Sequence, residues 1–302
     1  MKRKIIQLST NTSVISLPAG WIRTCNLKKG DEVDIEVSGN GIVVSSSRPR
    51  GRRETEIMLD SDDTLIAWEA IDSAYISGYD QISVRFSKPR MIEHIQKITS
   101  RMIGMAVTEE KKDACVIRDI GGQDHEEFDV VLRRVFLLLK TMGDDGIAAA
   151  KTGDFETLAA MRFRDYSVNS YTSYCLRCIN RGQYPPTTDP QKTYLLLKLL
   201  ESLGDKYRDM LSGLGKEKIR LGKKTLAYFF DLNAQYALLM EMFYAYNWKH
   251  AQQMVALRQG MKEKAATLIK SITGKEALAL HQLWEIQSLL FDAFETVLTM
   301  RM

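Results

Sequence analysis

The fold of the N-terminal part of the chain is decided by residues 13–33, which read SVISLPAGWIRTCNLKKGDEV. The β-branched residues at the start of this stretch predict a strand. Pro18 is typical of the start of a helical turn, because the N–H that proline lacks has no partner there. Gly30 ends the polar sequence KKG and predicts a turn that needs a positive φ. The stretch therefore predicts a strand, a short helix and a turn in close succession.

Further strands are predicted on both sides of this stretch, within residues 4–46. Ile5 lies in a β-branched segment that a polar turn at residues 9–13 separates from the next strand. Residues 33–37 alternate apolar and acidic side chains, which is the period of a half-buried strand, and residues 38–41 read SGNG, a hairpin turn. A unit of roughly 45 residues buries little apolar surface, so we expect it to pair with a second copy of itself.

Positive charge is concentrated at the N-terminal end of the chain. Residues 1–53 hold ten lysines and arginines and four acidic residues, whereas the rest of the chain holds 32 basic and 34 acidic residues. A basic segment attached to a nearly neutral body indicates a polyanionic partner. A second interpretation, in which the segment only improves solubility, stays open on the basis of charge alone.

Three motifs carry a family resemblance: SVISLP at residues 13–18, Trp21-Ile22, and LKKGDEV at residues 27–33. They resemble the swapped-hairpin DNA-binding domain of the AbrB/MazE/SpoVT family. The resemblance implies that two chains interleave their hairpins into one dimeric β-barrel, and that one face of this barrel contacts double-stranded DNA. The residues that it places on this face are Lys2, Arg3, Lys4, Asn11, Ser13 and Arg23.

The side chains on this face suit a DNA interface. Lysine and arginine supply phosphate contacts and an affinity that depends on salt, while asparagine and arginine can also read base edges. The alternative is a swapped-hairpin unit that serves only to hold two chains together.

The sequence after this DNA-binding domain, which we assign to residues 1–47, predicts a linker and a small α/β subdomain. Residues 48–53 read RPRGRR and combine proline, glycine and basic side chains, which is typical of a linker. Residues 54–122 predict alternating strands and helices and contain no catalytic constellation. The expected elements are a helix at 64–78 capped by Ser61 or Asp62, a strand at 82–86, a helix from Pro89 to Met102, and a hairpin of residues 105–109 and 114–119.

From residue 126 onward the apolar side chains recur at the helical period. We expect two all-α units of three helices each, at residues 123–213 and 214–302, packed side by side. Asp154 and Asn247 mark the start of the middle helix of each unit. The expected helices are one that ends at Gly153, one at 155–181, one that starts at Asp189-Pro190 with a cap and a proline, and three at 223–246, 248–272 and 275–300.

The third helix contains the motif LLESLGDKY at residues 199–207, which is similar to the Glu-x-x-Gly-Asp-type helix of PhoU domains. The motif and the order of the domains resemble those of archaeal PhoU-like regulators of phosphate uptake. Glu201 and Asp205 lie four residues apart on one helical face, so their carboxylates can approach one cation. The resemblance implies a divalent metal at this pair, such as iron, zinc or magnesium.

The acidic motif departs from the PhoU pattern in ways that weaken a metal site. Ser167 and Asn169 stand where the middle helix usually supplies carboxylates, which leaves Asp165 as the nearby acid, and Ser288 replaces an acid in the second unit. Neutral oxygens bind a hard cation less well. The alternative interpretation is a solvated acidic pair, paired with the basic side chains that follow it at residues 206 and 208.

Several features argue against an enzyme and against a membrane or secreted protein. No apolar run reaches the ~18 residues that span a bilayer, and polar residues interrupt the stretch after the basic N-terminus, unlike a signal peptide. Four scattered cysteines favour a reducing cytoplasm. Cys175 and Cys178 lack further metal ligands nearby, so we interpret them as buried thiols. Isolated histidines and the lack of a phosphate-binding loop favour a protein without catalytic activity.

Two functions follow from the sequence. In the first, the chain is a dimeric transcriptional regulator of phosphate uptake, whose N-terminal domain binds DNA and whose helical region receives a signal. In the second, the N-terminal domain only dimerises, and the helical region is a scaffold that docks a phosphate transporter ATPase or a sensor kinase.

Overall fold

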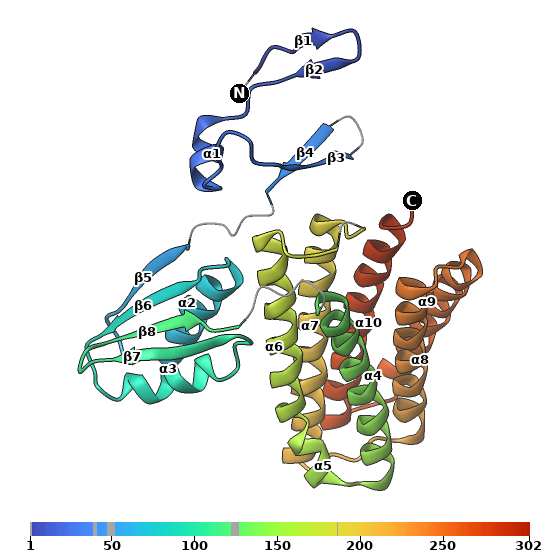
Figure 1. The fold of residues 1–302 in the computed structure, drawn as a ribbon. Helices are drawn as coiled ribbons and strands as arrows, with labels where there is room; N and C mark the ends of the chain where they lie inside the picture. The colour runs from blue at the N-terminus through green and yellow to red at the C-terminus, as the bar shows by residue number, and fades with distance from the viewer. Residues whose placement is uncertain (1, 39–40, 47–51, 122–126, 186) are drawn as a thin grey trace. The chain divides into compact units, whose positions relative to one another are not determined.

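A computed structural model describes residues 2–38, 41–46, 52–121, 127–185 and 187–302 of the chain. The chain divides into two compact units, Met1–Glu54 and Thr55–Met302, which we call the head and the body (Figure 1). Most of the predicted linker, residues 48–51, lies outside the described residues. No helix in the described part of the chain is both long and apolar enough to cross a membrane.

The head consists of two antiparallel hairpins with a short helix between them. Strand β1 (Ile6–Ser9) pairs with β2 (Thr12–Val14), and β3 (Asp34–Ser38) pairs with β4 (Gly41–Ser45). Helix α1 spans Ala19–Thr24 and begins directly after Pro18, and Gly30 has a φ of +94°, as the sequence predicts. Within one chain these hairpins form two separate two-stranded sheets. The closed barrel formed by the hairpins of two chains therefore stays a prediction.

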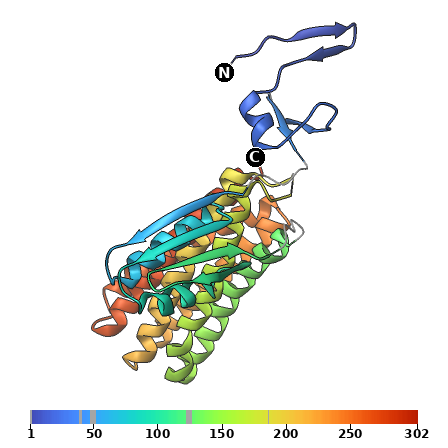
Figure 2. The same ribbon diagram turned by 60° about the vertical axis from the view of Figure 1, so that its left-hand side comes forward.

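The first part of the body is a four-stranded sheet with two helices on one face (Figures 1 and 2). The strand order is β5-β6-β8-β7, and β8 pairs antiparallel with both β6 and β7. The predicted strand at 82–86 and the predicted hairpin are confirmed. The elements are β5 (Glu54–Leu59), α2 (Thr64–Ile76), β6 (Gln81–Phe86), α3 (Met91–Thr99), β7 (Met105–Glu110) and β8 (Ala114–Asp119).

Two helix boundaries in this subdomain differ from the prediction. Asp63, and not Ser61 or Asp62, caps α2, because its carboxylate accepts a hydrogen bond from the backbone N–H of Leu65 at 2.8 Å. Helix α3 begins two residues after Pro89 and ends three residues before the predicted end, where hydrogen bonds from residue i to i−3 close its last turn.

The second part of the body is a bundle of long helices, and most predicted boundaries are confirmed to within three residues. Asp154, Asp189 and Asn247 each accept a hydrogen bond from a backbone N–H of the first helical turn, as expected of caps. The helices are α4 (Phe128–Thr152), α5 (Phe155–Ala160), α6 (Arg162–Arg181), α7 (Pro190–Lys216), α8 (Lys223–Tyr244), α9 (Trp248–Ile269) and α10 (Lys275–Thr299).

The prediction of one helix over 155–181 is wrong, because the chain breaks at Met161 into α5 and α6. The N–H of Met161 bonds to the carbonyl of Leu158 at 3.3 Å, a tightened turn of the i to i−3 type. Helix α5 packs directly on the end of α7, where a Cβ at Gly215 would lie 2.3 Å from the backbone nitrogen of Ala159. The lack of a side chain at Gly215 permits this close approach.

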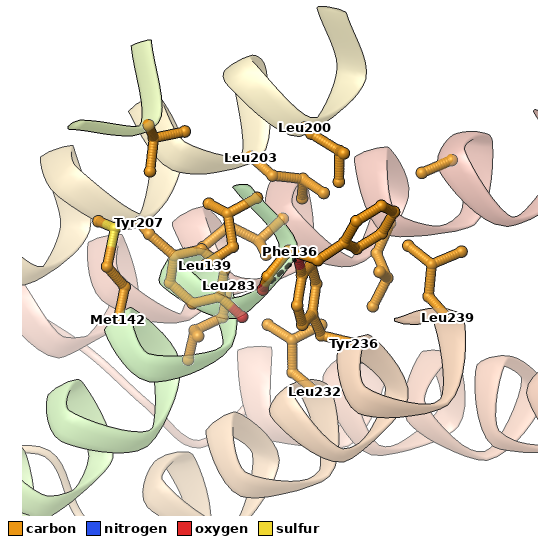
Figure 3. Packing of buried hydrophobic residues seen from close by; sticks show 14 of the residues in the cluster. Phe136, Leu139, Met142, Leu200, Leu203, Tyr207, Leu232, Tyr236, Leu239 and Leu283 are labelled. Atoms are coloured by element: carbon orange, nitrogen blue, oxygen red, sulfur yellow. Dashed lines mark hydrogen bonds between the residues drawn. The ribbon is translucent and has the colours of Figure 1, made fainter. Parts of the chain in front are cut away.

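One hydrophobic core runs through all the bundle helices, so the two predicted three-helix units share a single interior. Figure 3 shows part of this core, in which side chains of α4, α7, α8 and α10 meet. The hydroxyl of Tyr236 donates a hydrogen bond to the carbonyl of Phe136 at 3.0 Å. Buried hydroxyl groups with such partners avoid the cost of an unsatisfied polar atom.

Polar side chains of α6 join the sheet subdomain to the bundle. Arg177, 4% exposed, donates hydrogen bonds to the carbonyls of Tyr75 and Tyr79 at 2.9 and 2.8 Å and to the carboxylate of Asp119 at 2.8 Å. Asn180 donates to another carbonyl at the end of α2 at 2.8 Å. The two parts of the body are therefore fixed together by a guanidinium group that has little access to water.

Candidate nucleic-acid interface in the head

All six predicted DNA-contacting side chains are exposed in the head. Three of them precede β1 as a basic arm, Asn11 lies in the turn between β1 and β2, and Ser13 lies in β2 opposite Gln7. Arg23 lies in the last turn of α1. The predicted residues thus lie on three segments that follow one another along the chain, and each of their side chains is exposed.

The cations of this set carry unneutralised charge. Among the described residues, no acidic group forms an ion pair with Lys2, Arg3, Lys4 or Arg23. The acidic residue of the neighbouring turn, Asp31, instead accepts a hydrogen bond from the backbone N–H of Lys28. Exposed cations without acidic partners can bind phosphate groups and release counterions.

The head also exposes the apolar side chains that a folded domain normally buries. Among the head side chains that the structure describes, only Cys25 is buried. On the β3–β4 hairpin, Val37 lies directly opposite Ile42, and Ile35 lies two residues away on the same face. The exposed apolar side chains, at 50–75% exposure, are Ile5, Ile6, Leu8, Ile15, Ile35, Val37 and Ile42.

These side chains need a partner surface. Burying a side chain of this size stabilises a fold by about 1.5–3 kcal/mol, and exposed patches of this kind mark sites of association. A single head supplies no such core within its described residues. The sequence predicted the pairing of two heads from the length of the unit, and the exposed strands give that prediction its physical basis.

The acidic pair of α7, the second predicted site, is neutralised by the chain itself. Glu201 forms an ion pair with Lys198, and Asp205 forms one with Arg208. Arg208 also donates a hydrogen bond to the carboxylate of Asp165 on α6 at 2.8 Å. Its guanidinium group thus lies between Asp205 of the predicted pair and Asp165, the nearby acid of α6.

The ion pairs around the acidic pair match the solvated-pair interpretation in one of its two partners. Arg208 pairs with Asp205 as the solvated-pair interpretation expects, but Lys206 pairs with Glu285 of α10 at 3.0 Å instead. Burial raises the pKa of Asp165, which is 1% exposed, against the opposing effect of Arg208. No cluster of three or more metal-ligating side chains occurs among the described residues. A metal ion at this pair would have to displace Arg208. The predicted metal site is therefore supported only by the resemblance to PhoU domains.

Glu201 takes part in an electrostatic contact that the sequence did not indicate. Burial, followed by the charge of Glu201, raises the pKa of Asp72 on α2 from 3.8 to about 6. A hydrogen bond with Ser173 and the charge of Lys198 act in the opposite direction. Periodicity cannot reveal such a contact, because Asp72 and Glu201 lie far apart in sequence and meet only where α2 packs on the bundle.

We expect the Asp72→Asn substitution to remove a pH dependence of stability. The raised pKa in the folded state means that Asp72 stabilises the fold below pH ~4 and loses this effect as the pH rises through about 6. Wild-type protein should therefore lose about 1–2 kcal/mol of unfolding free energy through this group between pH 4.5 and 7. Urea unfolding at both pH values measures the difference.

The matched control for this substitution is Asp113→Asn in the exposed turn between β7 and β8. Asp113→Asn also removes one aspartate charge, but from an exposed side chain. This variant should therefore keep the pH dependence of the wild type. An equal pH dependence in Asp72→Asn and wild type would contradict the assignment.

The cysteines of the body are free and buried. Burial raises the pKa of the Cys178 thiol to about 11, and it raises the pKa of Cys175 as well. Both thiols therefore stay protonated near neutral pH and are poor nucleophiles and metal ligands. The interpretation of this pair as buried thiols is confirmed.

Comparison with known proteins supports the assignment of the head. Residues 6–54 match the family model described as antidote-toxin recognition MazE, bacterial antitoxin. No curated protein and no solved structure matches the chain. The matched range covers both hairpins, α1 and the first residue of β5. The N-terminal head is therefore similar to MazE-type antitoxin domains.

Proposed function

We propose that this chain is a DNA-binding transcriptional regulator whose head binds duplex DNA as a dimer. The observation that carries the proposal is the coincidence of three features in residues 6–54 and the arm before them. These are the match to the MazE family model and, among the described residues of the head, cations without an acidic partner and apolar strands without a core. Two heads that bury their strands together would present two copies of the basic arm to one duplex.

The body, in this proposal, is the part that receives the regulatory signal. The motif at residues 199–207 and the order of the domains support regulation of phosphate uptake, as in the archaeal PhoU-like proteins that the sequence resembles. We further propose that the chain acts in the cytoplasm and by binding rather than by catalysis. The proposal that the chain does not act by catalysis is supported by Cys175 and Cys178 of α6, whose protonated thiols are poor nucleophiles.

The test of the proposal is the double substitution Arg3→Ala and Arg23→Ala. DNA affinity should fall ~10-fold or more at low salt. The slope of log K against log salt should become shallower by about 0.9 for each phosphate group that the head no longer binds. Fluorescence anisotropy of a labelled duplex over a series of salt concentrations measures both quantities.

The control is Lys111→Ala with Lys112→Ala, which removes the same charge from an exposed turn of the body. Equal effects of the two double substitutions would show that net charge, and not the face of the head, governs binding. Failure of the wild-type protein to bind DNA would favour the second function, in which the body docks a transporter ATPase or a sensor kinase.

A further inference from the structure

A basic turn connects α7 and α8 at one end of the bundle. Residues 216–224 read KEKIRLGKK and hold five cations and one acidic residue. The two apolar side chains of the turn, Ile219 and Leu221, are half-buried and buried, so the exposed surface of the turn is charged. The body as a whole has slightly more acidic than basic residues, so this concentration is not part of a general excess.

Four of the five cations in the basic turn are available to a ligand. Lys216, Lys218, Lys223 and Lys224 are exposed, and none of them forms an ion pair with an acidic group in the described part of the chain. The fifth, Arg220, is engaged in packing, because its guanidinium group lies 5.6 Å from the ring centroid of Phe155.

Two acidic side chains that adjoin the basic turn already have partners. Glu217 pairs with Lys275 at the start of α10 at 2.5 Å. Glu276 accepts hydrogen bonds from the backbone N–H of Gly222 at 2.8 Å and from the hydroxyl of Thr225. These two carboxylates are therefore engaged elsewhere, and no ion pair neutralises the lysines of the turn in the described part of the chain.

We propose that the basic turn binds the phosphate backbone of duplex DNA as a second contact, made by the body in addition to the head. This inference rests on the proposed function of the head. Lysine ammonium groups are compact point charges that bind phosphates without reading sequence. A head bound to DNA holds the body of the same chain near the duplex, which raises the effective concentration of the basic turn.

A membrane surface fits the basic turn less well than DNA does. Binding to a bilayer combines cations with apolar or aromatic side chains that enter the acyl boundary. The turn has no aromatic residue, and its two apolar side chains pack toward the protein. The lysines of the turn can therefore bind phosphate groups only, and duplex DNA presents phosphate groups at a high density.

The experiment replaces Lys216, Lys218, Lys223 and Lys224 together by glutamine in the full-length chain. The probes are a labelled 30-base-pair duplex of mixed sequence and vesicles of phosphatidylserine and phosphatidylcholine. DNA affinity at low salt should fall ~10-fold or more, and the salt slope should become shallower by roughly 2 to 4. The same four lysines changed to arginine should leave both quantities close to those of the wild type.

The matched control changes four exposed lysines elsewhere on the body to glutamine. They also lack ion pairs among the described residues, and they are Lys97, Lys111, Lys112 and Lys249. Equal affinities of the two glutamine variants would overturn the inference while the proposed function stands. Loss of vesicle binding with unchanged DNA binding would overturn it in favour of a membrane. Absence of DNA binding by the wild-type chain would remove the proposed function and the inference together.

Discussion

Replacing Val37 by glutamate will prevent the dimerisation of heads and the DNA binding that we propose. Val37 is 75% exposed in the single chain and faces Ile42 across the β3–β4 hairpin. If two heads bury this face against each other, each dimer loses two buried valines, at about 1.5–3 kcal/mol apiece. The variant dimer would also have to bury the two introduced glutamate carboxylates without partners. The dissociation constant of the dimer should therefore rise by about a thousandfold or more.

Analytical ultracentrifugation of the full-length chain measures this effect, and anisotropy with labelled DNA measures its consequence for binding. The matched control is Met58→Glu in β5, because Met58 is also an exposed apolar residue of a strand, at 61% exposure. The control should stay dimeric. A dimer of unchanged stability in Val37→Glu would show that the apolar hairpin faces are not the association surface.

Replacing Arg177 by methionine will destabilise the body by about 3–5 kcal/mol, because it removes one partner of a buried ion pair. The substitution removes the guanidinium donor from the carbonyls of Tyr75 and Tyr79 and leaves Asp119 without its closest cation. Lysine at this position should recover only part of the loss, since one ammonium group cannot reproduce the planar fork of the guanidinium. Urea unfolding followed by circular dichroism measures the free energy.

Arg164→Met is the matched control for this prediction. Arg164 forms an ion pair with Asp145 at 2.5 Å, but both side chains are more than a third exposed, at 39% and 48%. Exposed pairs of this kind contribute about 0–1 kcal/mol, so the control should cost little. Equal losses in the two variants would mean that the buried guanidinium does not hold the sheet subdomain on the bundle.

The sequence was sufficient to predict the long helices and their caps, since the signals for both are local. Asp189 followed by Pro190 predicts the start of α7, and the structure confirms the cap. The break at Met161 was not predictable in this way, because nothing in the local sequence differs from a helix. It depends on the close approach of α5 to Gly215 of α7, a contact between residues more than fifty positions apart.

The candidate sites also differ in whether they depend on local sequence or on contacts between distant residues. The exposed cations of the head could be named from motifs, because a motif preserves the order of residues along one short segment. The pairing of Arg208 with Asp205 could be named as well, because these residues lie three apart on α7. The pairing of Arg208 with Asp165 could not, since it forms only after α6 and α7 have packed. The contacts of Arg177 with α2 span about a hundred residues and leave no periodic signal.

The most direct test of DNA binding by the head is a titration of labelled duplex with the full-length chain and with a chain that lacks residues 1–53. Each titration is made at about 50 and about 200 mM salt. We predict that the full-length chain binds as a dimer, that its affinity falls steeply between the two salt concentrations, and that the shortened chain binds at least ~100-fold more weakly at the lower one. Equal binding by both chains, or none by the full-length chain, would contradict DNA binding by the head.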